Sequence, residues 1–190
     1  MLLSWDLDRP AIWAHDFGGA VSLRARLLQG ASVGRHLLMN VVAVRPWGSA
    51  FFEHVGRHID AFMGLPAHIH AAVVEAYIRG ALACDLEQAT VDKLTHPWLS
   101  GAGKEAFYAQ FAQADERYTA EIEPGFGSLS GHVHVLWGAE DPWIPLTRGA
   151  QLADQIGCQI ESMPGLGHLA QLEDPGRAGK RALAFLLGGD

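Results

Sequence analysis

The stretch Ala14-His15-Asp16-Phe17-Gly18-Gly19 decides how the rest of the chain is interpreted. It follows a short apolar run at residues 10–13 and precedes a helical pattern at residues 20–28. A small residue, a candidate nucleophile two positions later and a glycine two positions after that, between a strand and a helix, form the pattern of a nucleophile elbow. Such a turn is so tight that side chains near it must be small. It holds its central residue above the N-terminus of the next helix, where the dipole favours negative charge. An Asp followed by Gly-Gly is also an ordinary turn.

The central residue of this stretch is Asp16, where a serine is more familiar. An aspartate carboxylate is ordinarily ionised at neutral pH, so it can act as a nucleophile without a general base. The sequence therefore predicts nucleophilic chemistry at a carboxylate.

Composition limits the class of protein and its partners. The chain has 190 residues, of which 49% are hydrophobic, and this is enough for one domain with a sizeable core. The net charge of -7 argues against nucleic acid and anionic membrane surfaces as partners. Cys84 and Cys158 are too few for a disulfide framework, which favours a cytoplasmic protein. No apolar run approaches the roughly 20 residues of a membrane span.

Hydrophobic periodicity divides the chain into three parts, at residues 1–49, 50–128 and 129–190. The first and last parts alternate between strand and helix patterns, whereas the middle part shows helical periodicity only. This predicts an α/β fold of about four parallel strands with flanking helices, interrupted by a helical cap insertion. The expected strands are residues 11–15, 36–44, 132–137 and 159–163; the expected helices are 20–29, 51–63, 66–83, 86–94, 103–121, 146–156 and 174–187.

Two further chemical groups follow predicted strands. Asp141 comes after the strand at 132–137, and His168 comes after the strand at 159–163. The carboxyl ends of parallel strands meet at one edge of a sheet, where such sheets bind their ligands. We therefore expect Asp16, Asp141 and His168 to converge. His168 should lie within about 3–4 Å of Asp141, or of Glu140 if that residue is the acid instead.

The order Asp16, Asp141, His168 is the order nucleophile, acid, histidine of the α/β hydrolases. From about residue 7 to its C-terminus the chain resembles that superfamily, and within it the branch with an Asp nucleophile, the epoxide hydrolases and haloalkane dehalogenases. The resemblance implies that Asp16 attacks an electrophilic carbon and forms an alkyl ester. His168 would then activate water to hydrolyse the ester, while Asp141 orients His168. The chemistry implied needs no metal or organic cofactor.

The resemblance covers only the C-terminal half of the hydrolase fold. The absent half normally contributes a backbone N–H to the oxyanion hole and a strand that pairs with residues 11–15. Without it that strand is an exposed apolar edge. Residues 1–7 have the pattern of the tail of a helix. We therefore expect a fragment or a late-called start, with weak or no turnover as the chain stands.

The residues predicted to bind substrate are aromatic. Phe17 follows the nucleophile, where the dehalogenases usually have a Trp that donates an N–H to the halide. Epoxide hydrolases use two cap tyrosines as donors, and Tyr77, Tyr108 and Tyr118 all fall in the predicted cap. These residues and Trp47 are candidates for the pocket; the alternative for each is ordinary packing. The apolar composition of the cap favours a small apolar molecule as substrate.

The remaining histidines are predicted to have structural roles. His15 is expected to pack beside the elbow. His58, His68 and His70 are expected on helix surfaces, and no carboxylate or cysteine pattern completes a metal site with them.

Two other functions compete with an epoxide or halide hydrolase. In the first alternative, the chain is an inactive fragment or a partner-dependent module. In the other it is an esterase-like homologue that became inactive when Asp16 replaced a serine.

Overall fold

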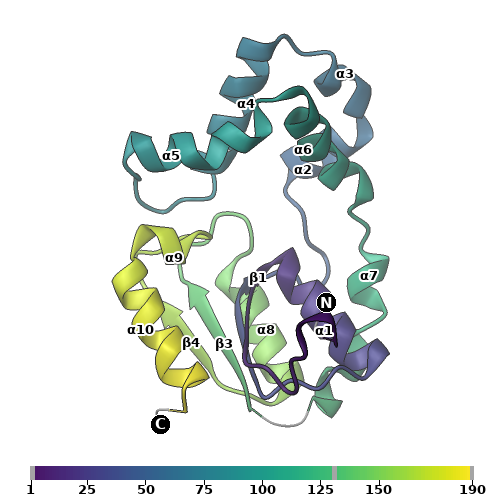
Figure 1. The fold of residues 1–190 in the computed structure, drawn as a ribbon, viewed down its shortest axis with the longest axis vertical. Helices are drawn as coiled ribbons and strands as arrows, with labels where there is room; N and C mark the ends of the chain where they lie inside the picture. The colour runs from purple at the N-terminus through teal and green to yellow at the C-terminus, as the bar shows by residue number, and fades with distance from the viewer. Residues whose placement is uncertain (1–2, 130–131, 189–190) are drawn as a thin grey trace.

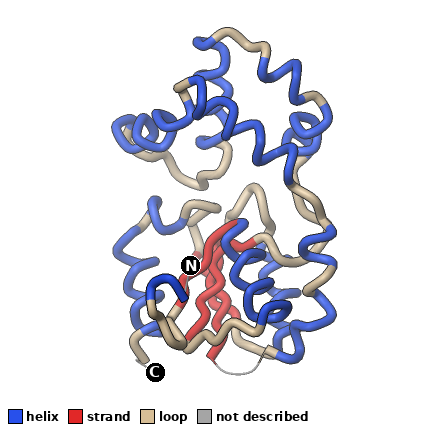
Figure 2. The backbone as a smooth tube through the Cα atoms, turned by 45° about the vertical axis from the view of Figure 1, so that its right-hand side comes forward, coloured by secondary structure: helices blue, strands red, loops and turns tan. Residues whose placement is uncertain are grey.

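The computed structural model describes residues 3–129 and 132–188. Its centre is a parallel sheet in which the strands follow one another in sequence order, β1-β2-β3-β4. The strands of this sheet are drawn red in Figure 2. The predicted four parallel strands are therefore confirmed. The strands are β1 (Ile12–Asp16), β2 (Arg35–Val41), β3 (His132–Gly138) and β4 (Ile160–Met163).

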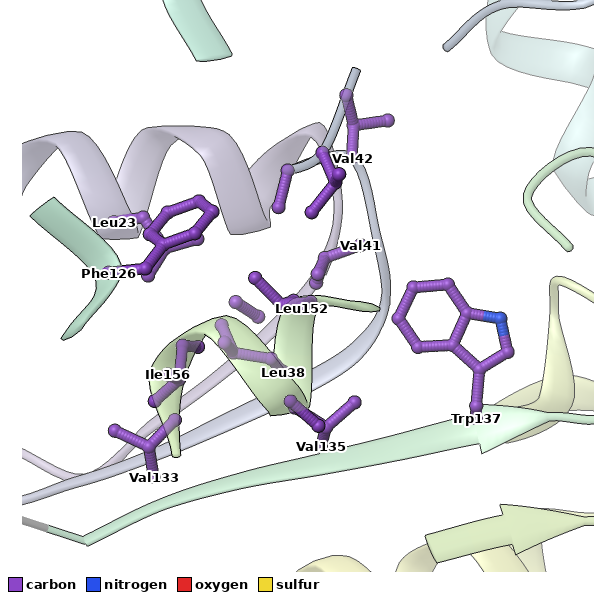
Figure 3. Packing of buried hydrophobic residues seen from close by; sticks show 14 of the residues in the cluster. Leu23, Leu38, Val41, Val42, Phe126, Val133, Val135, Trp137, Leu152 and Ile156 are labelled. Atoms are coloured by element: carbon purple, nitrogen blue, oxygen red, sulfur yellow. The ribbon is translucent and has the colours of Figure 1, made fainter. Parts of the chain in front are cut away.

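Helices cover both faces of the sheet. On one face Leu38 and Val135 pack with Leu23 of the first helix and Ile156 of a later one, as Figure 3 shows. On the other face Leu37 and neighbouring strand residues pack against the C-terminal helix. Strands buried on both faces need continuous apolar sequence, which explains the apolar run in β2. The covering helices are α1 (Phe17–Gln29) and α8 (Leu146–Ile156) on the first face, and α9 (Ala170–Glu173) and α10 (Pro175–Leu186) on the second.

Between β2 and β3 the regular elements of the described residues are all helices, joined by loops, and most of this segment forms a separate lobe above the sheet (Figure 1). This lobe has an aromatic-rich core of its own, which includes Val55, Val74 and Phe107. The cap contains α2 (Ala50–Arg57), α3 (Ile59–Met63), α4 (Ala67–Arg79), α5 (Gln88–Thr95), η2 (His96–Trp98) and α6 (Gly101–Gln113). After it, α7 (Arg117–Ala120) and η3 (Glu123–Ser128) return to the sheet and pack against α1 and α8, so the last part of the predicted cap segment 50–128 belongs to the core by its packing.

Two predicted cap helices are each divided in the structure. The pattern at 51–63 breaks at His58, whose N–H bonds to Val55 O, three residues back, instead of continuing the α-helical ladder. The pattern at 103–121 breaks at Ala114, which is extended, and the Asp115 carboxylate accepts the Arg117 N–H at 2.8 Å to start α7. A local side-chain bond such as that of Asp115 competes with the helix. Neither break changes the hydrophobic periodicity, so the sequence pattern does not reveal it.

The two ends of the chain differ in how well the sequence predicted them. The expected helix tail at residues 1–7 is only a short 3-10 helix, η1 (Leu3–Trp5), and Met1 and Leu2 lie outside the described residues. At the other end Asp174 caps α10 as predicted, because its Oδ1 accepts the Arg177 N–H at 2.9 Å. Within the described ranges no helix is both long and apolar enough to cross a membrane.

Candidate active site

Asp16 occupies a strained turn between β1 and α1. Its backbone angles are φ 50° and ψ -130°, a conformation that residues other than glycine avoid. Asp16 is the N-cap residue of α1, yet its side chain makes no capping hydrogen bond, whereas Asp174 caps α10 with its carboxylate. Because the Asp16 side chain is not engaged by its own helix and is 34% exposed, it is available to a bound molecule.

The glycine that permits this turn is Gly19. A Cβ atom on Gly19 would lie 2.3 Å from Val41 Cβ, whereas one on Gly18 would have nothing within 4 Å. The motif as read from the sequence ends at Gly18, but the close approach of α1 to β2 is made one residue later.

We expect Gly19→Ala to destabilise the protein by about 1–3 kcal/mol, because the added methyl group has to displace Val41. Gly18→Ala is the matched control and should be neutral or stabilising by up to about 1 kcal/mol, since alanine is the better helix former. Urea unfolding of both variants measures the difference. Equal stabilities would show that the elbow adapts to a side chain at Gly19.

The carboxylate of Asp141 is buried at the end of β3 and has four hydrogen-bond donors. Its Oδ1 accepts the backbone N–H groups of Trp143 and Ile144, both at 2.8 Å. Its Oδ2 accepts His168 Nδ1 at 2.8 Å and Asn40 Nδ2 at 2.7 Å. Asp141 is 6% exposed and therefore sits as a fully bonded anion inside the protein.

Glu140 does not share this role. Its Oε2 instead accepts the Gly165 N–H at 2.6 Å, in the loop that leads to His168. Of the two predicted acids, the structure brings Asp141 into contact with His168.

The imidazole of His168 lies between the two aspartates. Nδ1 donates to Asp141, and Nε2 lies 3.8 Å from Asp16 Oδ1. Among the described residues Nε2 has no hydrogen-bond partner, although it is buried. The expected convergence of Asp16, Asp141 and His168 is therefore present. Burial alone would lower the pKa of His168, but the hydrogen bond with Asp141 and the negative charges of Asp141 and Asp16 outweigh it and raise that pKa to about 9.

His15 helps to hold His168 from behind. Its Nε2 donates to the backbone carbonyl of His168 at 2.8 Å, and the two rings lie 4.7 Å apart. Burial and the neighbouring His168 lower the pKa of His15, which keeps the ring neutral. The expected packing role beside the elbow is confirmed.

The raised pKa of His168 makes stability depend on pH. The folded-state value of about 9 lies above the ordinary 6.5, so the contribution is complete below pH 6.5 and disappears as pH rises to about 9. We expect the free energy of unfolding to fall by the order of 3 kcal/mol across this interval. Urea titrations at about pH 6 and about pH 9.5 test this, and His168→Gln should flatten the dependence. A wild-type profile as flat as that of the variant would contradict it.

A narrow cleft of about 40 Å³ opens beside Asp16 and is lined by aromatic rings. Phe17, Trp47 and Tyr77, three of the residues predicted to bind substrate, line this cleft. Tyr118 does not; it lines an adjoining cavity of about 380 Å³ that shares Phe17 and Trp47 with the cleft. The wall is therefore built from both the core and the cap.

Tyr108 and His70 lie inside the cap, and two predictions about them are wrong. Tyr108 is fully buried and does not line the cleft; its hydroxyl pairs with His70 Nδ1 at 3.0 Å. His70, expected on a helix surface, is 1% exposed, and its Nε2 donates to the Trp98 carbonyl at 2.9 Å. The two polar groups satisfy each other within an aromatic core, which allows both to be buried. His58 and His68 are exposed as expected.

Sequence reasoning missed Asn40 and Trp143. Asn40 is fully buried near the end of β2 with φ 45°; it donates to Asp141 and accepts the Gly138 N–H at 3.0 Å. The sequence signal that could have identified Asn40 was a single amide side chain within an otherwise apolar strand. Trp143 stacks on Tyr77 at 4.4 Å between ring centroids and contacts the His168 ring at 4.9 Å. Its position two residues after Asp141 was the signal for it.

Comparison with known proteins agrees with this fold. Residues 2–178 match the model of the alpha/beta hydrolase family. A crystal structure of an alpha/beta hydrolase fold protein from Burkholderia ambifaria is 41% identical, with a TM-score of 0.93 over 96% of this chain and 68% of that one. The chain belongs to the alpha/beta hydrolase family.

More distant relatives have named activities. A 2-hydroxy-6-oxo-6-phenylhexa-2,4-dienoate hydrolase of Burkholderia cepacia is 31% identical over 70 residues, which is 36% of this chain and only 24% of that enzyme. An enzyme of the same name from Rhodococcus is 15% identical, with a TM-score of 0.78 over 98% of this chain and 66% of that one. This second likeness is one of fold alone.

Proposed function

We propose that this protein is a hydrolase that opens small apolar epoxides through an ester on Asp16. An Asp16 oxygen attacks a ring carbon, the carbon–oxygen bond of the ring breaks, and the released alkoxide takes the proton that the resting His168 imidazole carries, which leaves His168 neutral. His168 Nε2 then removes a proton from water, the resulting hydroxide attacks the ester carbonyl, and the diol leaves as the Asp16 carboxylate is restored. The observation that carries the proposal is the buried, unpartnered Nε2 of His168 beside Asp16, with Nδ1 bound to Asp141.

Tyr77 favours an epoxide over an alkyl halide as the substrate. It lines the cleft with Asp16, and its hydroxyl has no hydrogen-bond partner in the described part of the chain. Burial, and to a smaller extent the charge of Asp16, raise the pKa of Tyr77, so the hydroxyl stays protonated and can donate to an alkoxide. Phe17 has no donor with which to receive a departing halide.

We expect Tyr77→Phe to lower kcat/KM for styrene oxide by about 10²–10³-fold, as the loss of one donor to a developing oxyanion does. Tyr108→Phe removes a hydroxyl that binds His70 in the cap core and should reduce stability more than rate. Steady-state kinetics and urea unfolding of both variants separate the two effects. Equal rate losses would count against Tyr77 as the donor.

The named relatives favour a second candidate, in which the substrate is cleaved by direct attack of water with Asp16 and His168 as bases. The 31% identity to a 2-hydroxy-6-oxo-6-phenylhexa-2,4-dienoate hydrolase is the observation behind it. The substrate in that case is a carbonyl compound, and no bond forms between it and the protein.

A single turnover in ¹⁸O-labelled water distinguishes these functions. Ester formation on Asp16 predicts that the first diol carries unlabelled oxygen from the carboxylate and that the label enters Asp16, as peptide mass spectrometry would show. Direct attack of water labels the product and leaves Asp16 unlabelled. If the protein is folded and ¹⁸O enters neither the product nor Asp16, the result would support the alternatives in which the chain is an inactive fragment or an inactive esterase-like homologue.

A further inference from the structure

The loop that carries His168 is in direct backbone contact with the cap. The His168 N–H donates to the Ala81 carbonyl at 2.9 Å. At Gly167 a Cβ atom would lie 2.5 Å from Ala83 N and 2.8 Å from Ala81 O, so the two backbones touch where any side chain would separate them. Residues 81–84 follow α4 of the cap, whereas Gly167 and His168 belong to the core.

One carboxylate bonds both sides of this contact. Glu173, the last residue of α9, accepts the N–H groups of Ala83 at 3.0 Å and Cys84 at 3.2 Å with its Oε2. The Gly167 N–H donates to the same carboxylate, at 3.0 Å to Oε1 and 3.1 Å to Oε2. Three backbone donors from two parts of the fold thus converge on a single anion, and hydrogen bonds to a charged acceptor are the stronger kind.

The loop has little room on its other side. A Cβ on Gly138, at the end of β3, would lie 2.0 Å from Gly167 O and 2.7 Å from Leu166 O. The backbone before His168 is therefore held between the sheet and the cap. A displacement of residues 81–84 must either break their bonds to Glu173 or move the His168 loop.

We propose that Glu173 is a positioning residue that latches the His168 loop to cap residues 81–84, so that the location of His168 Nε2 beside Asp16 depends on the seating of the cap. Glu173 acts through the backbone of Gly167 and does not touch the reacting atoms. The catalytic consequence rests on the proposed function, because it concerns the step in which His168 activates water. The structural consequence, that Glu173 holds the His168 loop against the cap, does not depend on the proposed function.

The test compares Glu173→Gln with Glu123→Gln. The glutamine at 173 keeps the shape but carries no charge, and its amide nitrogen cannot accept an N–H. With the amide oxygen in the place of Oε2, the Gly167 N–H keeps only one of its two acceptors, and all three donors face a neutral group. Glu123 is a matched control, since its carboxylate also accepts a backbone N–H, that of Arg45 at 2.9 Å, and does not contact the His168 loop. Glu173→Asp, which keeps the charge but shortens the reach, provides a second variant if the glutamine variant does not fold.

Two measurements need no substrate. Hydrogen exchange at the amides of Ala83, Gly167 and His168 should accelerate by about 10-fold or more in Glu173→Gln, as expected when hydrogen bonds to a charged acceptor become bonds to a neutral one. NMR titration of the His168 ring should show a lower pKa than in wild type, because looser contact with Asp141 removes part of what raises it. Glu123→Gln should change neither quantity.

A kinetic measurement separates the latch from the proposed function. If the ester on Asp16 exists, Glu173→Gln should slow its hydrolysis about 10- to 100-fold with KM little changed. If no ester forms in wild type but exchange and titration change as expected, the latch stands and the proposed function fails. If folded Glu173→Gln shows the wild-type rate of hydrogen exchange at the His168 amide and the wild-type pKa of the His168 ring, the proposed role of Glu173 is overturned.

Discussion

Replacing His168 by glutamine is expected to stop turnover after the first chemical step and to leave a stable ester on Asp16. Attack by the carboxylate does not need the imidazole as a base, whereas hydrolysis of the ester does, and a general base typically contributes about 10²–10⁴-fold. His168→Gln incubated with styrene oxide should therefore gain the mass of one substrate molecule, and peptide mapping should place that mass on Asp16.

The double variant Asp16→Asn, His168→Gln is the control for this result. It keeps the fold and the aromatic cleft but has no ionisable group at position 16, so it should gain no mass. An adduct of equal yield in the double variant would show alkylation elsewhere. A single variant that stays unmodified while wild type turns over would contradict the ester mechanism.

The raised pKa of His168 gives this first step an electrostatic consequence. With a pKa of about 9 the resting imidazole is protonated at neutral pH, held between two carboxylates. Ester formation as proposed would remove the charge of Asp16 and leave Asp141 as the remaining anion. The pKa of His168 then falls, because burial continues to lower it. In the proposed mechanism the reaction itself would thus convert His168 toward the neutral base that the second step requires.

Most of the fold could be predicted because it depends on patterns that are local in sequence. The apolar run of β2 and the Asp174-Pro175 start of α10 each carry their own signal. The elbow was also visible, since a small-residue turn around Asp16 follows a strand and precedes a helix. These signals were sufficient to predict which three chemical groups meet at the sheet edge.

The parts that sequence did not predict depend on contacts between distant residues. Asn40 belongs to the site only because β2 lies beside β3, which brings its amide to Asp141. His70 is buried because Tyr108, 38 positions away, supplies its polar partner. Periodicity cannot distinguish such a satisfied polar pair from a surface histidine and a pocket tyrosine. Glu173 is similar, because its three backbone donors come from two loops that converge only in the folded chain.

The second large effect is expected from Asp141→Asn. Asn would place an amide NH₂ where one carboxylate oxygen now accepts hydrogen bonds, and all four groups that face Asp141 are donors. If the NH₂ faces His168, Nδ1 becomes the acceptor and Nε2 carries the proton. The ring then cannot take a proton from water. An asparagine at the equivalent position of a serine-protease triad costs about 10⁴-fold, and we expect a loss of about 10³–10⁴-fold in hydrolysis of the Asp16 ester.

Glu140→Gln is the matched comparison, because Glu140 is the neighbouring carboxylate and the other candidate acid. A glutamine there can still accept the Gly165 N–H through its carbonyl oxygen, so turnover should change by no more than about 3-fold. NMR titration gives a second measurement: the pKa of His168 should fall from about 9 in Asp141→Asn and stay near that value in Glu140→Gln. If Glu140→Gln proves the more damaging change in both measurements, the acid of this site is Glu140, and the contact between Asp141 and His168 serves only to hold the ring.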